Sequence, residues 1–314
     1  MKAHRFHFSE LLLALTMFCF LSPVLAAPPS PAPVEASRAP FSFALPHPRS
    51  FRNEVIGGKP TADRKIVGIH YIDNGSVGRV CSGLWISRRF VLTAAHCTCN
   101  NSSNSFLVSN DTVAANDWRP ATLHKRYDES FCAFFRPREG NDLALLALNS
   151  GLLLPAKVNE RPCDDYSLID DIKLASTYIL APPARLLVAG YGFVGDMPGS
   201  LGQRREAEVG VNTLTCAQPL AQALGCTPLK EIILGAGRTD GEIRDTCGGD
   251  SGGPTYLRQG DRLMPVGIVS RGLPIAQVFP NRGLCGSGGI YTLLGRKEVI
   301  AWLRDAGVPS GTQC

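Results

Sequence analysis

The chain has 314 residues, of which 44% are hydrophobic and 19% charged, and its formal net charge is +5. This composition is ordinary for a globular protein with a substantial core, and it excludes a disordered or fibrous chain. The small positive charge gives no reason to expect a nucleic-acid partner.

The amino-terminal residues have the pattern of a secretory signal. Lys2 and Arg5 precede an apolar run from Leu11 to Leu21, and small residues follow it. Because this run is too short to span a bilayer, we expect residues 1–26 to be removed as a signal peptide. A membrane anchor is the alternative. No later stretch approaches a membrane span, so the mature protein is expected outside the cytoplasm and without a membrane partner.

The rest of the chain divides in two by composition. Residues 27–54 are rich in Pro, Ala and Ser and lack periodicity, so they are expected to be a linker or pro-segment. Residues 55–314 contain short apolar or alternating runs punctuated by Gly, Pro, Asn and Asp, which predicts an antiparallel all-β barrel or sandwich. One helix is predicted at about 296–306, before a glycine and a proline.

The cysteine count favours disulfides. Eleven cysteines are present, and ten remain once Cys19 is removed with the expected signal. An even number in a secreted chain suits up to five disulfides. Zinc bound by His96, Cys97 and Cys99 is the competing interpretation, but the C-x-C spacing is poor for a tetrahedral site. We therefore predict neither a metal nor a cofactor.

The segment TCGGDSGGP, residues 246–254, surrounds Ser251 with glycines and a proline. Such a segment is unsuited to a helix or a central strand. It is either a plain glycine-rich turn or a bend that points backbone N–H groups at a reacting atom beside an exposed hydroxyl.

A serine nucleophile would need a histidine base and a group that orients it. Of His70, His96 and His124, the second stands out, because LTAAHC ends an apolar strand with two alanines and a cysteine. Asp142 begins a run that must be buried, where a carboxylate is costly unless paired. A simple strand cap is the alternative for Asp142.

Four motifs follow one another along the chain: VIGG at 55–58, LTAAHC at 92–97, NDLALL at 141–146 and GDSGGP at 249–254. Together with the terminal helix, they resemble the chymotrypsin/trypsin-like serine peptidase family, from about residue 55 to 309. The resemblance implies an all-β fold of two antiparallel six-stranded β-barrels, with the active site between them and a C-terminal α-helix.

The same resemblance implies a secreted serine endopeptidase and assigns roles by position. His96 would be the general base, Asp142 its orienting acid and Ser251 the nucleophile. The backbone N–H groups of Gly249 and Ser251 would form the oxyanion hole. A catalytically silent binding protein of the same fold is the alternative function.

The sequence G-x-S-x-G at 249–253 also matches the nucleophile elbow of α/β-hydrolases. That fold requires a histidine after the serine, and none follows His124 in this chain. The lipase or esterase interpretation therefore fails on chain order.

The resemblance places Asp245 at the floor of the primary pocket. A buried carboxylate there would form charge-assisted hydrogen bonds with a substrate Arg or Lys, so proteins or peptides with these residues at the cleavage site are the expected substrates. A surface acid in a loop is the alternative. The other residues that the resemblance assigns to substrate binding are Thr246, Ser270, Gly272 and Gly289.

Several positions depart from the family pattern. Arg271 stands where an aromatic residue is usual, which makes hydrophobic subsites doubtful and acidic ones conceivable. The interval from Gly272 to Cys285 is long, so an insertion at the pocket rim is expected. Tyr191 replaces a common tryptophan.

Five disulfides are expected on three grounds. The resemblance implies Cys81–Cys97, which would brace the histidine turn, and Cys247–Cys285, which would tie the nucleophile loop to the pocket rim. Cys216–Cys226 is expected because these two flank one short segment. Elimination then leaves Cys99–Cys132 and Cys163–Cys314.

The resemblance also implies a zymogen. A cut before Val55 would free an ammonium group that pairs with Asp250. However, Glu54 stands where Arg or Lys is usual, so an enzyme of the expected specificity would not cut there. An activating protease that accepts Glu54, or a cut after Arg52 followed by trimming, is expected; the alternative is that no terminal insertion is needed.

Overall fold

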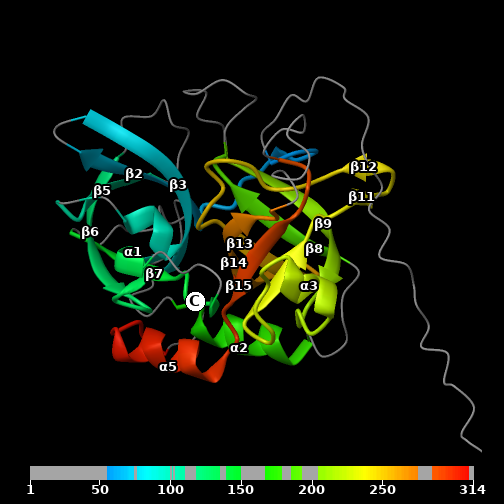
Figure 1. Ribbon diagram of the computed structural model, residues 1–314. Helices are drawn as coiled ribbons and strands as arrows, with labels where there is room; N and C mark the ends of the chain where they lie inside the picture. The colour runs from blue at the N-terminus through cyan, green and yellow to red at the C-terminus, as the bar shows by residue number, and fades with distance from the viewer. Residues whose placement is uncertain are drawn as a thin grey trace, which may run out of the picture. The chain divides into compact units, whose positions relative to one another are not determined.

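The computed structural model of the chain is shown in Figure 1. It describes residues 55–73, 76–99, 101, 103–109, 118–134, 139–149, 167–178, 185–192, 204–274 and 285–310. All of these belong to one unit of the chain, Ser42–Cys314. The expected signal peptide and pro-segment lie outside the described residues.

The first barrel closes with six antiparallel strands in the order β2-β3-β4-β7-β6-β5. These strands are β2 (Ile66–Asp73), β3 (Ser76–Ser87), β4 (Phe90–Thr93), β5 (Ser105–Ser109), β6 (Arg119–Arg126) and β7 (Ala144–Leu148). The short 3₁₀ helix η1 (Ala95–Thr98) follows β4, and α1 (Phe131–Phe134) lies between β6 and β7. Apolar and β-branched side chains such as Ile66, Val91 and Leu145 fill the interior.

The second barrel has the strand order β9-β10-β15-β14-β13-β8, and pairing of β8 with β9 closes it. Its strands are β8 (Arg185–Gly190), β9 (Arg205–Thr213), β10 (Glu231–Leu234), β13 (Pro254–Gln259), β14 (Arg262–Gly272) and β15 (Gly289–Leu293). The short β1 (Lys59–Pro60) pairs with β9, and β11 (Arg238–Thr239) pairs with β12 (Glu242–Ile243). Helix α3 (Pro219–Ala223) lies between β9 and β10.

The predicted terminal helix is α5 (Lys297–Asp305). It buries Val299, Ile300 and Leu303 against the first barrel, and Trp302 meets the ring of Tyr127 edge-on at 5.5 Å. In Figure 1, α5 lies beneath the strands of that barrel. The predicted fold of two antiparallel six-stranded barrels with a C-terminal helix is confirmed.

A longer helix was not predicted. Helix α2 (Ile169–Tyr178) packs against β14 and buries Ile169, Ile172 and Ala175. The hydroxyl of Ser167 accepts a hydrogen bond from the N–H of Ile169 and so caps its first turn. Across the described ranges, no helix is long and apolar enough to cross a membrane.

Candidate active site

His96 and Asp142 are brought together by two neighbouring strands. The pairing of β4 with β7 places Thr93 opposite Ala144, so the residues just beyond these strand ends meet. His96 Nδ1 lies 2.8 Å from Asp142 Oδ2, and the backbone N–H of His96 donates to Oδ1 at 2.9 Å. The carboxylate therefore fixes both the ring and the backbone of the histidine.

Asp142 accepts a third hydrogen bond, from a residue of the second barrel. The Oγ of Ser270, in β14, donates to Asp142 Oδ2 at 2.6 Å. Burial alone raises the pKa of Asp142, but the adjacent His96 and the hydrogen bonds from His96 and Ser270 outweigh it and hold the pKa below its ordinary value. The buried carboxylate is thus kept ionised, and the ring of His96 donates from Nδ1 and leaves Nε2 as the acceptor.

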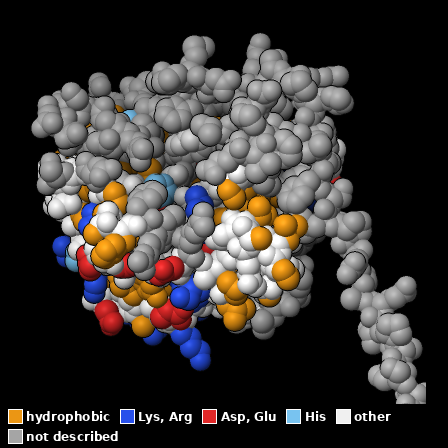
Figure 2. Space-filling model, in the orientation of Figure 1, with side chains coloured by type: hydrophobic (Ala, Val, Ile, Leu, Met, Phe, Trp, Pro, Cys, Tyr) orange, Lys and Arg blue, Asp and Glu red, His pale blue; other side chains and the backbone are white. Residues whose placement is uncertain are grey.

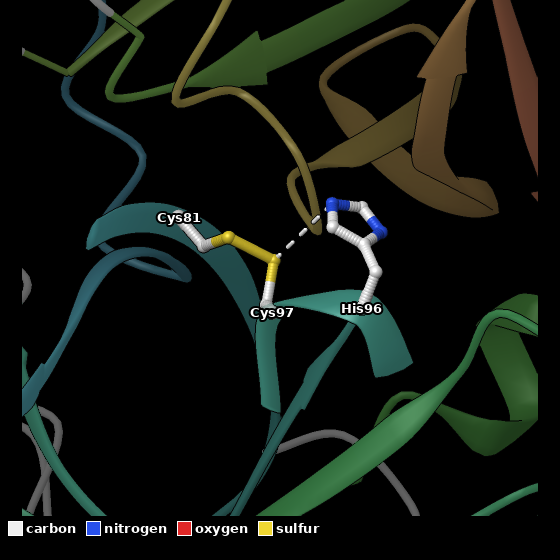
Figure 3. A group of neighbouring side chains, drawn as sticks. All are labelled: Cys81, His96 and Cys97. Carbon is white, nitrogen blue, oxygen red and sulfur yellow. Dashed lines mark hydrogen bonds between the residues drawn. A yellow bond between two sulfur atoms is a disulfide. The ribbon is translucent and has the colours of Figure 1, made fainter. Parts of the chain in front are cut away.

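Two disulfides bracket the histidine turn. Cys81–Cys97 ties η1 to β3, and Cys99–Cys132 ties its end to α1. Figure 3 shows the imidazole beside the first of these, with Nε2 lying 3.7 Å from Cys97 Sγ. Because both sulfurs on either side of Thr98 are in disulfides, neither is available as a thiolate ligand for zinc.

A cluster of potential metal ligands includes the same histidine. Among the described residues, Cys81, His96 and Cys97 are the one group of potential ligands that lie within 4.8 Å of one another. Two of these three atoms form the disulfide drawn in Figure 3, so the cluster offers the histidine nitrogen alone.

Ser251 lies on the loop before β13, against the first barrel. Its carbonyl oxygen accepts the N–H of Ser82 at 2.7 Å and lies 3.6 Å from Cys97 Sγ, the same sulfur that contacts His96. A Cβ on Gly252 would stand 2.1 Å from Thr93 Oγ1, so only glycine permits this approach. The glycine at 252 therefore lets the Ser251 loop pack closely against β4 and the histidine turn.

The preceding residue, Asp250, is fully buried. Its Oδ1 accepts the N–H of Gly192 and its Oδ2 that of Cys247, each at 2.8 Å. A Cβ on Gly190 would lie 2.2 Å from Asp250 Oδ1, which explains the glycine there. Val55 is likewise buried, with an exposed fraction of 1%.

Asp245 is buried rather than on the surface, with an exposed fraction of 2%. Its carboxylate accepts the backbone N–H groups of Thr246, Gly286 and Gly288 at 2.8, 3.0 and 2.8 Å. Burial nevertheless raises the pKa of Asp245 to about 7, against the lowering effect of these three donors. The alternative of a solvated loop acid does not hold.

Two of the other expected pocket residues adjoin the Asp245 carboxylate and its donors, since Thr246 follows Asp245 and Gly289 follows Gly288, whereas Ser270 bonds to Asp142. Gly272 pairs with Gly289 across β14 and β15, and Thr246 Oγ1 lies 3.1 Å from the hydroxyl of Tyr291. A Cβ on Gly289 would lie 3.1 Å from the Tyr291 ring and 3.4 Å from Thr246 Oγ1. The disulfide Cys247–Cys285 joins the start of the Ser251 loop to the segment that precedes β15.

Arg271 is held by a partner that sequence reasoning missed. Its guanidinium contacts both carboxylate oxygens of the fully buried Glu231, at 2.7 and 2.9 Å. It also donates to Ser270 Oγ at 3.2 Å and to the carbonyl of Gly225 at 2.7 Å. The positive charge is thus compensated inside the protein, so the expectation of an acidic subsite loses its basis. The available signal in the sequence was Glu231 itself, because an acid at the start of the apolar run EIIL needs a partner when it is buried.

The structure contains four of the five expected disulfides: Cys81–Cys97, Cys99–Cys132, Cys216–Cys226 and Cys247–Cys285. The fifth, Cys163–Cys314, lies outside the described residues, as do most of the positions of the expected rim insertion.

The face drawn in Figure 2 carries charged side chains of both signs. Figure 2 shows acidic and basic side chains interspersed over the lower part of one face, where described residues are exposed.

Comparisons with known proteins agree with the motifs. Residues 55–281 match the family described as Trypsin. Human serine protease 41 is 29% identical over 234 residues, which cover 71% of this chain and 67% of that protein. Alkaline trypsin C of Manduca sexta is 27% identical over 218 residues, covering 64% and 76% of the two chains. The proclotting enzyme of Tachypleus tridentatus is 26% identical over 306 residues, covering 89% and 74%.

Proposed function

Because the chain belongs to the trypsin family of serine proteases, we propose that it is a secreted endopeptidase that hydrolyses peptide bonds after Arg or Lys. The observation that carries the proposal is the buried, ionised Asp142, hydrogen-bonded twice to His96 next to the loop of Ser251. A carboxylate, an oriented imidazole and a serine in this relation are the parts that acyl transfer to a hydroxyl requires.

In the proposed reaction, Ser251 Oγ attacks the substrate carbonyl while His96 Nε2 takes the hydroxyl proton. Asp142 stabilises the imidazolium that forms. The tetrahedral intermediate then collapses, His96 gives the proton to the leaving amine, and an acyl-enzyme remains. Water then attacks the acyl-enzyme with His96 as base. Collapse of the second tetrahedral intermediate releases the carboxylic acid product and restores the hydroxyl of Ser251.

The oxyanion of each tetrahedral intermediate is proposed to bind the backbone N–H groups of Gly249 and Ser251. Gly249 has a φ of +92°, in the region that favours glycine, which supports this bend. Fixed backbone donors stabilise developing charge without reorganising during the reaction.

The preference for Arg or Lys is proposed to come from Asp245. Its carboxylate is buried and its raised pKa records the cost of ionisation without a counter-charge. A substrate cation would supply that charge and recover the cost. Thr246, Ser270, Gly272 and Gly289 are proposed to line the same pocket.

The chain organisation is proposed to follow from secretion and activation. Residues 1–26 would be the signal peptide, 27–54 the pro-segment and 55–314 the peptidase domain. An activating protease that cuts before Val55 would then be a partner, and the name of one relative, a proclotting enzyme, fits a precursor stage. Neither nucleic acid nor, after signal removal, a membrane is a proposed partner.

The test uses the chain with a recognition sequence for an added protease placed directly before Val55. The cut protein is incubated with a mixed peptide library and with a fluorophosphonate that labels activated serines. Cleavage after Arg and Lys, lost in Ser251→Ala and in His96→Ala, supports the proposal, since these residues work as one unit. If the folded parent neither cleaves nor takes up the label, the protein is a silent binding protein of this fold.

A further inference from the structure

Ser82 makes two hydrogen bonds to the Ser251 loop, and no sequence motif indicates them. It follows Cys81 in β3 of the first barrel and is fully buried. Its N–H donates to the carbonyl of Ser251 at 2.7 Å, and its Oγ donates to the carbonyl of Gly249 at 2.8 Å. One residue of the first barrel therefore holds the carbonyls on both sides of Asp250.

The direction of the hydroxyl bond is unambiguous. The N–H of Tyr191 donates to Ser82 Oγ at 2.8 Å, and this backbone group can only donate. The carbonyl of Gly249 can only accept. The single hydroxyl proton must therefore point at Gly249, and the side chain forms a bridge from Tyr191 through Ser82 to Gly249.

The bridge lies one peptide away from a proposed oxyanion donor. Gly249 has no Cβ to restrict its rotation, and its N–H is useful only while the backbone keeps the observed bend. The peptide that follows Gly249 is fixed through its carbonyl by Ser82 and through its N–H by Cys247, whose carbonyl is 3.1 Å from the nitrogen of Asp250. The peptide that follows Ser251 is fixed by the N–H of Ser82.

We propose that Ser82 is a positioning residue of the reaction: its hydroxyl holds the Gly249–Asp250 peptide so that the N–H of Gly249 stays directed at the oxyanion. This inference rests on the proposed function. Ser82 itself touches neither the substrate nor the reacting atoms.

The surroundings make the hydroxyl hard to replace. A Cβ on Gly190 would lie 3.0 Å from Ser82 Oγ, and one on Gly253 would lie 3.2 Å from Ser82 Cβ. Deleting one oxygen atom from such a site leaves less space than the roughly 30 Å³ a water molecule occupies. In Ser82→Ala, the carbonyl of Gly249 is left without its donor and is expected to turn toward another partner.

The experiment compares Ser82→Ala and Ser82→Gly with a matched control, Ser167→Ala. Ser167 is also fully buried, and its hydroxyl accepts the N–H of Ile169 at 3.2 Å, at the start of α2. Each variant is cut before Val55, and kcat and KM are measured on an Arg peptide. Two inhibitors are added: a peptide aldehyde, whose adduct places an oxyanion in the hole, and benzamidine, which needs only the Asp245 pocket.

We expect both Ser82 variants to lose kcat by about tenfold or more, with KM within threefold of the parent. The aldehyde Ki should rise by a similar factor, whereas the benzamidine Ki should stay within twofold. Ser167→Ala should lose stability but change none of these constants. Ser82→Gly is decisive where Ser82→Ala does not fold.

Folded Ser82 variants with unchanged kcat and unchanged aldehyde Ki would overturn the inference. If the parent itself has no activity, the proposed function fails, and hydrogen exchange decides the positioning role separately. Faster exchange of the amides of residues 247–253 in the Ser82 variants than in Ser167→Ala supports it, and equal exchange overturns it.

Discussion

Ser270 Oγ and His96 Nδ1 share one acceptor, Oδ2 of Asp142, at 2.6 and 2.8 Å. The carboxylate belongs to the first barrel and the hydroxyl to the second, so this oxygen joins the two barrels at the candidate active site. Because the carboxylate is fully buried, each donor contributes to keeping it ionised.

Ser270→Ala tests that contribution through stability. Asp142 has a lowered pKa, so its ionised form stabilises the folded protein above the unfolded pKa, and this stability is lost as the pH falls through the folded value. Losing the Ser270 donor should cost about 1.5–3 kcal/mol at pH 7 and progressively less below about pH 4. Urea unfolding in a Ser251→Ala background, which prevents self-digestion, measures the difference.

The control is Ser167→Ala in the same background, because its hydroxyl serves an uncharged N–H. Its loss should not depend on pH. A Ser270→Ala difference that is equally independent of pH would contradict the account.

The residues proposed to carry the chemistry were accessible from sequence for a local reason. His96, Asp142, Ser251 and Asp245 each stand in a motif or at a fixed offset from one. Ser82 offers no such sign, because its hydroxyl meets a carbonyl 167 residues later and it reads locally as a small strand residue. Long-range contacts of this kind depend on how the two barrels meet.

Helix α2 was missed for a different reason. Only three buried positions, Ile169, Ile172 and Ala175, carry its apolar periodicity, together with the buried Asp171. The carboxylate of Asp171 is satisfied by Arg262 of β14, at 2.7 Å from Nε. A helix with an acid on its buried face is specified by its tertiary partner and not by its own pattern.

The raised pKa of Asp245 predicts a pH dependence of cation binding. In the proposed pocket the carboxylate is the form that would bind benzamidine, and protons would compete for it below about pH 7. The benzamidine Ki should therefore be constant at pH 8 to 9 and should weaken by about tenfold per pH unit below the pKa. Asp245→Ser should bind weakly at every pH, and a parent Ki that stays flat from pH 8 to 5.5 would contradict the prediction.

The Arg271–Glu231 ion pair is expected to contribute to the free energy of unfolding. Arg271→Ala leaves the fully buried Glu231 without its cation, so we expect a loss of about 3–5 kcal/mol in the free energy of unfolding. The double variant Arg271→Ala with Glu231→Gln should recover part of that loss, since the amide is neutral. Urea unfolding of the single and double variants gives the coupling, and purely additive losses would mean that the pair is not coupled.

The segment that begins at Val55 is bonded to Asp245, and this arrangement bears on activation. Val55 is buried, the N–H of Ile56 donates to the carbonyl of Asp245 at 2.8 Å, and that of Asp245 returns to the carbonyl of Ile56 at 3.3 Å. This bridge ties the start of the expected mature chain to the residue that is proposed to form the pocket floor. A Cβ on Gly58 would lie 2.6 Å from the carbonyl of Val55, so the segment is closely packed as well as bonded.

Two matched proteins test whether Val55 must be the first residue. In one, an added cleavage sequence stands directly before Val55; in the other, it stands before Asn53, so that two extra residues remain. An ammonium group on Val55 could insert and pair with the buried Asp250, whereas the longer terminus would carry its charge two residues away. We therefore expect kcat/KM on an Arg peptide to be at least a hundredfold lower for the longer form, with aminopeptidase trimming restoring it. Equal kcat/KM for the two forms, with amino-terminal sequencing to show that Asn53 is intact, would establish that this protein needs no terminal insertion.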